Sequence, residues 1–161
     1  VLGDALAMVL LEARGVDKED FARYHPAGRL GRALLLKVHQ IMRGEDQLAK
    51  AFPETPIVEV IKSMTSRRAG AAVVVNAEGS LEGIFTHGDF ARYFPNTPDI
   101  GTRAVGDFMT RNPVTISDDQ LAAEVLRVLQ MHRIDDIIVV DGAQHPIGIV
   151  DSQDLSRLKI L

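Results

Sequence analysis

The sequence contains no cysteine, so its 161 residues cannot form a disulfide framework. It also lacks a run of Lys and Arg that would contact a phosphate backbone, and its formal net charge is −4. These two features argue against a nucleic-acid-binding protein. No apolar stretch approaches the roughly 18–20 residues that a membrane-spanning helix needs. We therefore expect a cytoplasmic protein with neither nucleic-acid nor membrane partners.

Metal-binding patterns are also absent from the sequence. Four histidines are scattered without the close spacing of metal ligands: His39, His87, His132 and His145. We therefore expect no metal and no cofactor. Hydrophobic residues make up 46% and charged residues 25% of the chain, which is ordinary for a globular domain. The first residue is Val1 rather than Met, so we expect the chain to belong to a longer protein.

One stretch of the sequence occurs twice, 65 positions apart. Residues 83–90 (GIFTHGDF) match residues 148–155 (GIVDSQDL). The same offset relates two further pairs of segments: 57–61 to 122–126, and 72–76 to 137–141. A period of this length indicates one supersecondary unit used twice. We expect a pseudo-twofold pair of units with a cleft between them.

Both copies predict the same order of elements, β-α-β-β-α, which places the chain in the α/β (α+β) class. In the first copy we expect a helix at 56–65, strands at 71–76 and 81–85, and a helix from about residue 86. In the second copy we expect a helix at 121–132, strands at 137–140 and 147–150, and a helix at 153–158. Ser117, with Gln120 three residues later, has the pattern of a capping box for helix 121–132.

The segment from Thr86 to Asp89 follows an apolar strand and opens a helix, so backbone N–H groups are expected to point out of the strand end. A hydroxyl and a carboxylate at this spacing can bind the hydroxyls of a ribose. The same T-x-x-D pattern is also a capping box. From the tetrapeptide alone, both interpretations stay open.

The paired units resemble tandem CBS domains, through their starts at Ile41-Met42 and at residues 108–110 (FMT) and through the GIFTHGDF end. The resemblance covers residues 41–161 and implies a regulatory module that binds an adenosyl or other nucleotide between the repeats. It implicates Thr86 and Asp89 in one site and Asp154 in the other. Asp151 stands where the first copy has Thr86, and its carboxylate would repel a phosphate. We therefore expect one competent site, in the first repeat.

Two further residues are weaker candidates for ligand binding. Thr55 precedes the first helix of the first repeat, where an N-cap is the alternative interpretation. Asp107 lies just before the first strand of the second repeat, where CBS pairs line their cleft. A solvated turn aspartate is the alternative for Asp107.

Residues 1–40 lie before the first repeat and are expected to be helical, with helices at about 4–13, from 17, and at 29–39. Their motifs, above all residues 25–32 (HPAGRLGR), resemble the end of a sugar isomerase (SIS) domain of the arabinose-5-phosphate isomerase family. That family interconverts ribulose 5-phosphate and arabinose 5-phosphate for the Kdo sugar of lipopolysaccharide or capsule. The resemblance makes His25 a catalytic residue of the parent enzyme, although Ala27 stands where the family usually has Gly. We expect this chain alone to be inactive.

Together these features predict three parts: the SIS remnant with its linker at 1–40, one CBS repeat at 41–97 and a second at 98–161. The predicted function is allosteric regulation of an isomerase by an adenine nucleotide or CMP-Kdo, in a homo-oligomer. The alternative is a CBS pair that serves only for oligomerisation. Its contacts would be apolar helix faces at Val60/Met64 and at Val125/Leu129.

Overall fold

The structure is a computed structural model that describes residues 36–157. The helices expected before residue 36, and with them His25, lie outside the described residues. The described end of the third expected helix is not α-helical. Lys37 is extended, and Val38–Gln40 form a short 3-10 helix, η1.

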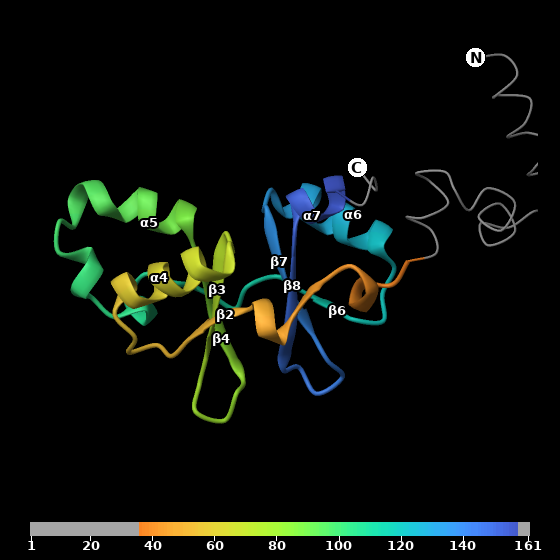
Figure 1. The fold of residues 1–161 in the computed structure, drawn as a ribbon, viewed down its shortest axis with the longest axis horizontal. Coiled ribbons are helices and arrows are strands. Elements are labelled where there is room, and N and C mark those ends of the chain that lie inside the picture. The colour runs from red at the N-terminus through yellow and green to blue at the C-terminus, as the bar shows by residue number, and fades with distance from the viewer. Residues whose placement is uncertain (1–35, 158–161) are drawn as a thin grey trace, which may run out of the picture.

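Two units, each with a four-stranded sheet, lie side by side, with α4 and α5 in one unit and α6 and α7 in the other (Figure 1). The first sheet has the order β2 (Ala49–Ala51), β3 (Ala71–Val75), β4 (Leu81–Thr86) and β5 (Thr110–Arg111). The second has the order β1 (Arg43–Gly44), β8 (Pro146–Asp151), β7 (Asp136–Val140) and β6 (Thr115–Ser117).

The helices complete the predicted order of elements. The α-helices are α4 (Ile57–Arg67), α5 (His87–Tyr93), α6 (Ala122–His132) and α7 (Ser152–Arg157). The remaining 3-10 helices are η2 (Glu45–Gln47), η3 (Phe94–Asn96), η4 (Ile100–Thr102) and η5 (Val105–Asp107). Each unit therefore contains β-α-β-β-α, as the 65-residue repeat predicts. The parallel pairs β2–β3 and β6–β7 follow from this order, because parallel neighbours need a crossover, here a helix.

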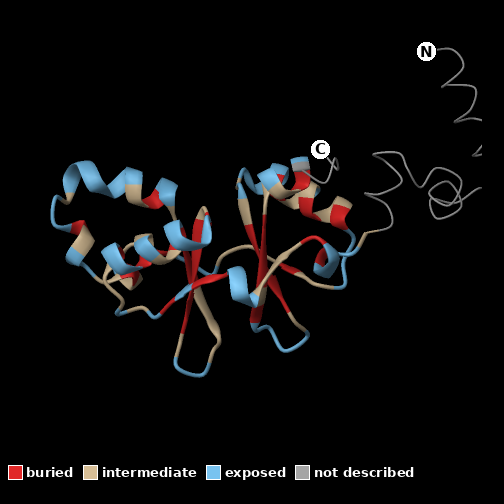
Figure 2. Ribbon diagram, viewed as in Figure 1, coloured by how far each residue is buried: buried red, intermediate tan, exposed pale blue. Residues whose placement is uncertain are grey.

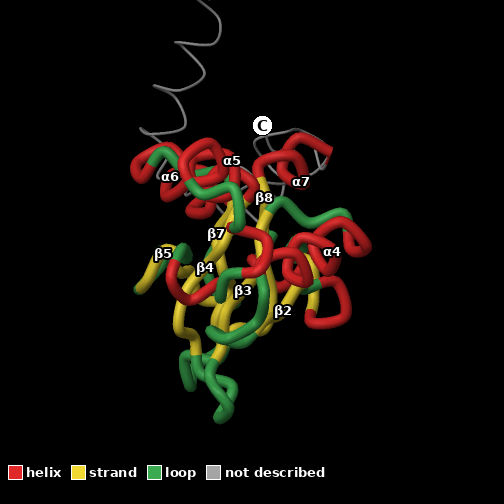
Figure 3. Tube along the Cα trace, turned by 90° about the vertical axis from the view of Figure 1, so that its left-hand side faces the viewer, coloured by secondary structure: helices red, strands yellow, loops and turns green. Residues whose placement is uncertain are grey.

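The first short strand of each repeat joins the sheet of the other repeat. β1 pairs antiparallel with β8, and β5 pairs antiparallel with β4. Viewed from the side of the first unit, β5 and β2 form opposite margins of its sheet (Figure 3). The registers place Arg43 opposite Ile149 and Thr110 opposite Ile84. Because Ile84 and Ile149 are related by the repeat, Arg43 and Thr110 occupy equivalent positions.

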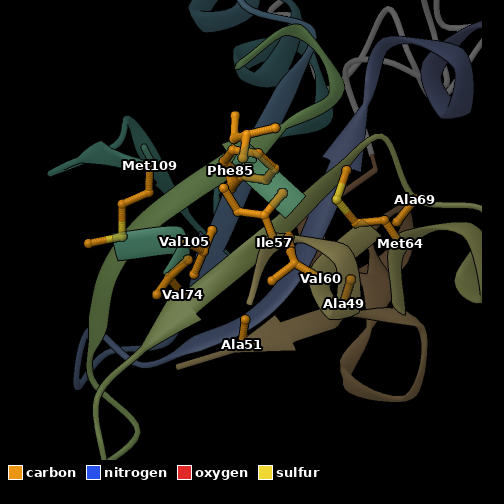
Figure 4. Close-up of a cluster of buried hydrophobic side chains, with 12 residues drawn as sticks. Ala49, Ala51, Ile57, Val60, Met64, Ala69, Val74, Phe85, Val105 and Met109 are labelled. Carbon is orange, nitrogen blue, oxygen red and sulfur yellow. The ribbon is translucent and has the colours of Figure 1, made fainter. Parts of the chain in front are cut away.

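The apolar residues form three clusters, and most of the buried residues lie on the strands and on the inner faces of the helices (Figure 2). One cluster belongs to the first unit, where Val74 and Phe85 pack against α4 and η5 (Figure 4). A second joins α6 and α7 to β7 and β8. The third lies where the two sheets face each other and includes Val73 and Ile138. β3 and β7 are thus covered on both faces, which explains their continuous apolar runs.

Two predicted features are wrong in detail. Ser117 does not cap α6, because it lies in β6 and the N-cap is Leu121, which makes no side-chain cap hydrogen bond. The helix faces proposed for oligomerisation are also unavailable. The four side chains on those faces are at most 4% exposed, because they form the cores of their own units: Val60, Met64, Val125 and Leu129.

Two equivalent glycines allow the exchanged strands to approach. A Cβ atom at Gly83 would lie 2.6 Å from the sulfur of Met109 and 2.8 Å from the carbonyl oxygen of Thr110. A Cβ at Gly148 would lie 2.5 Å from the sulfur of Met42. The glycine that begins each repeated octet is therefore required by the strand that arrives from the other repeat.

We expect Gly83→Ala to lower the free energy of unfolding by about 1–3 kcal/mol, because the backbone carbonyl of Thr110 must shift to admit the methyl group. Urea unfolding measures the change. Gly142→Ala is the matched control, since no atom lies within 4 Å of its added Cβ. Equal stabilities for the two variants would contradict this account of the crossing.

Candidate functional site

A cleft of about 1060 Å³ is lined by residues of both repeats. The starts of α5 and α7 contribute to it, as do the residues that follow α4 and α6. The lining residues that matter for chemistry are Arg68, Thr86, Asp89, Arg133, Asp136 and Asp151. The cleft thus contains the first-repeat motif that the sequence singles out and residues 151–153 of the second, but not Asp154.

Thr86 and Asp89 form a complete capping box at the start of α5. The Asp89 backbone N–H donates to Thr86 Oγ1 at 3.1 Å, and the Thr86 backbone N–H donates to Asp89 Oδ2 at 3.0 Å. The Thr86 hydroxyl also donates to Asp89 Oδ2, at 2.9 Å. Arg92 Nη1 donates to Asp89 Oδ1 at 3.0 Å. The capping interpretation is therefore confirmed.

This cap restricts what Asp89 can offer a ligand. Its side chain is only 6% exposed. A carboxylate has about four acceptor positions, and three of those of Asp89 are occupied by Thr86 and Arg92. The remaining acceptor position is on Oδ1, the oxygen that faces Arg92. The carboxylate can accept one further hydrogen bond, as from a ribose hydroxyl.

The second-repeat motif has a different occupant, the guanidinium of Arg43. Arg43 Nη2 lies 2.6 Å from Asp151 Oδ2, and Nε lies 2.8 Å from Asp154 Oδ2. Nη2 also donates to Asp154 Oδ1 at 3.0 Å. The three side chains are only 12–15% exposed. The hydrogen bond to Asp154 raises the pKa of Arg43, while burial opposes that shift. Asp151 does replace Thr86, but a cation of this chain pairs with its charge.

Arg68 and Arg133 are cleft residues that the sequence reasoning does not identify. Each follows a helix in the left-handed conformation, with φ values of 52° and 53°. Within residues 36–157, no hydrogen bond or ion pair engages either guanidinium group. Their 65-residue separation was a usable signal, because it places an arginine at the same point of both repeats. Two such cations can bind an anionic ligand.

Asp136 lies opposite Gly70 in the cleft. A Cβ at Gly70 would be 3.4 Å from both carboxylate oxygens of Asp136. Burial raises the pKa of Asp136 from its ordinary 3.8 to about 6, and the neighbouring charges of Asp151 and Asp135 add to the rise. Arg43 opposes the shift. Near neutral pH this wall of the cleft carries a destabilising negative charge.

The two weaker candidates are not in the cleft. Thr55 Oγ1 accepts a hydrogen bond from the backbone N–H of Phe52 at 3.0 Å, and Pro56 is the N-cap of α4. Asp107 is exposed at the end of η5. Neither lines the space that contains Thr86, so the structure does not bring them together with the motif. His25 lies outside the described residues.

Two further features of residues 36–157 concern metal binding and membrane insertion. No group of three or more His, Asp or Glu side chains there is arranged to hold a metal ion. In the same residues, no helix is long and apolar enough to cross a membrane.

The repeated fold and its cleft define the class of protein. A CBS domain model matches residues 38–96 and again residues 105–160. The chain belongs to the CBS-domain family and is a tandem CBS pair.

The curated relatives include arabinose 5-phosphate isomerases of Gram-negative bacteria. The chain is 39% identical over 161 residues to arabinose 5-phosphate isomerase KdsD of Pseudomonas aeruginosa and 36% identical to that of Escherichia coli K12. Each alignment covers 100% of this chain and 49% of the relative. The chain therefore spans about half the length of these relatives.

Solved structures share the fold. An uncharacterized conserved protein from Pyrococcus horikoshii is 29% identical, with a TM-score of 0.68, over 76% of this chain and 90% of that one. The CBS domain pair of protein MJ0100, solved with 5′-methylthioadenosine and S-adenosyl-L-methionine, is 27% identical. Its TM-score is 0.69, over 76% of this chain and 94% of that chain.

We expect Asp136→Asn to raise the free energy of unfolding at neutral pH, by up to about 3 kcal/mol. The carboxyl binds its proton more tightly in the folded than in the unfolded protein. The contribution of Asp136 to the free energy of unfolding therefore falls as pH rises from about 4 to about 6. Urea unfolding between pH 5 and 7.5 measures the gain, which should grow with pH. Asp119→Asn, at an exposed loop position, should show no such trend. A gain that is constant with pH would contradict the burial of this charge.

Proposed function

We propose that this chain is the regulatory, nucleotide-binding CBS pair of an arabinose-5-phosphate isomerase. The observation that carries the proposal is the cleft between the repeats. It is lined by the first-repeat motif and by two arginines, after α4 and α6, whose guanidinium groups make no hydrogen bond or ion pair within residues 36–157. Its volume of about 1060 Å³ suits a nucleotide, since small-molecule sites typically span about 300–1,000 Å³. The MJ0100 pair, solved with two adenosyl compounds, supports this choice of ligand class.

The chemistry of the cleft suggests how such a ligand would lie. Its phosphate would face Arg68 and Arg133, because these guanidinium groups have no partner within the described residues. A ribose hydroxyl would donate to the remaining acceptor of Asp89, next to Thr86. Asp136, on the opposite repeat, would accept from an exocyclic amine of a base. Both an adenine nucleotide and CMP-Kdo carry these three groups.

Regulation would follow from the position of the ligand. A ligand that contacts both repeats stabilises one relative orientation of the two units over others. The chain enters the pair through Leu36 and β1, and β1 belongs to the sheet of the second repeat. A change in that orientation would therefore be transmitted to the segment before residue 36, where the isomerase domain is expected.

The parent activity is proposed from the relatives. Several curated proteins that align with the whole chain are named arabinose 5-phosphate isomerase, and this chain covers about half of each. We assign the chain to such an enzyme, with His25 as its proton-transfer residue, in a cytoplasmic pathway toward lipopolysaccharide or capsule. An imidazole titrates near neutral pH and suits the proton shuttle of an aldose–ketose isomerisation. Assembly into a homo-oligomer remains a prediction.

We expect calorimetric titration to show that at least one of AMP, ATP, CMP and CMP-Kdo binds more tightly than about 1 mM, the affinity that corresponds to about 4 kcal/mol. Asp89→Asn should weaken that binding about tenfold or more, because a charged hydrogen bond is lost. Arg68→Ala should weaken the binding of AMP more than that of adenosine, since only AMP has the phosphate. Arg103→Ala, an exposed arginine outside the cleft, is the matched control.

Two results would contradict the ligand proposal. One is the absence of binding by all four compounds at millimolar concentration. The other is an equal loss of affinity for AMP and for adenosine in Arg68→Ala, which would show that the phosphate does not lie beside Arg68. If no compound binds and the chain still forms defined oligomers by light scattering, the oligomerisation alternative is favoured.

We expect the 161-residue chain to show no interconversion of ribulose 5-phosphate and arabinose 5-phosphate, because it spans only about half of the isomerases that it resembles. Proton NMR of the sugar phosphates measures the conversion. In an enzyme of the relatives' full length, His25→Asn should lower kcat about 100-fold, within the range of general acid–base catalysis. Turnover by the short chain would contradict the assignment.

A further inference from the structure

The side chain of Arg43 crosses from one repeat to the ligand motif of the other. It comes from β1, at the start of the first repeat, and its guanidinium contacts Asp151 and Asp154 at the start of α7. At the equivalent position in the first site stands Thr110, whose short side chain carries no charge. The two motifs thus differ in their cations: the guanidinium of Arg43 bridges two carboxylates in the second, whereas in the first Arg92 of the same helix donates to Asp89 alone.

We propose that the second-repeat motif is a guanidinium site whose permanent ligand is Arg43. It is therefore closed to an external nucleotide, and removing the Arg43 side chain would open it to small planar cations. The inference does not depend on nucleotide binding at the first site, because it concerns contacts within the chain.

Asp151 is held in place independently of Arg43. Asp151 Oδ1 accepts the backbone N–H of Asp154 at 2.7 Å, which caps α7. The other oxygen of Asp151 and both oxygens of Asp154 accept from the guanidinium. A planar fork with several N–H donors matches two neighbouring carboxylates, whereas a lysine offers a single charged point. The geometry therefore selects guanidinium over other cations.

Arg43 also joins the two repeats. Its Nη1 donates to the backbone carbonyl of Arg68, at the end of α4, at 2.8 Å. A smaller pocket of about 570 Å³ lies beside this contact and is lined by Arg43, Arg67, Arg68, Gln153 and Asp154. Because Asp154 lines this pocket, a small cation would have a path to the carboxylates once the side chain of Arg43 is removed.

The test compares thermal unfolding of the 161-residue chain with that of Arg43→Ala, in guanidinium chloride or sodium chloride at about 20 mM, far below denaturing concentrations. We expect Arg43→Ala to melt about 5–10 °C below the unsubstituted chain, because two poorly exposed carboxylates lose the guanidinium that bridges them. Guanidinium, relative to sodium, should then raise the melting temperature of Arg43→Ala by about 2–4 °C.

Arg127→Ala is the matched control, because Arg127 also pairs with a carboxylate, Glu124, but on an exposed surface. Neither this variant nor the unsubstituted chain should respond to guanidinium. Equal responses of all three proteins, or the absence of a response by Arg43→Ala, would overturn the proposal. Should Arg43→Ala fail to fold, Arg43→Lys provides the test. It should melt below the unsubstituted chain without responding to guanidinium, and melting at the temperature of the unsubstituted chain would refute a need for the planar fork.

Discussion

Each repeat needs the first short strand of the other repeat to complete its sheet. The rest of the structure depends on this exchange of edge strands. β1 leaves the first repeat to pair with β8, and β5 leaves the second to pair with β4. The exchange works because Gly83 and Gly148 leave room for the methionines of the arriving strands. It also brings the sheets face to face, where they bury a shared apolar cluster. The cleft exists because two units are held together in this way.

The exchange also places different residues at equivalent positions of the two sheets. The arriving strand brings Thr110 to the first sheet and Arg43 to the second. Arg43 neutralises Asp151 and Asp154, so the carboxylate that replaces Thr86 is part of an ion pair. The phosphate repulsion expected from Asp151 is therefore offset by a cation of the chain, and the inequality of the two sites stays a prediction.

The parts of the fold that follow from local pattern could be predicted, and the contacts between repeats could not. Continuous apolar runs and the 65-residue offset identify the strands, helices and pseudo-twofold arrangement. The exchanged strands are two residues long, which is too short to show a hydrophobic periodicity. Their pairing therefore cannot be predicted from the sequence. The contact between Arg43 and Asp151 spans 108 positions and depends on that pairing. The predicted cap of α6 is wrong because Ser117 lies in β6, which the local sequence pattern does not indicate.

The chain enters the pair through the second unit. The second repeat therefore matters for the proposed regulation even though Arg43 occupies its motif. Val38 and Ile41 are buried in the core of the second unit, and the backbone N–H of Val38 donates to the carbonyl of Gln120 at 2.9 Å. Residues 36–44 are thus fixed to the second unit, while Arg43 also reaches the end of α4 in the first. A rotation between the units would separate contacts that this single side chain makes to both. The proposed regulatory signal therefore has a defined route, from the end of α4 through Arg43 to the segment that precedes residue 36.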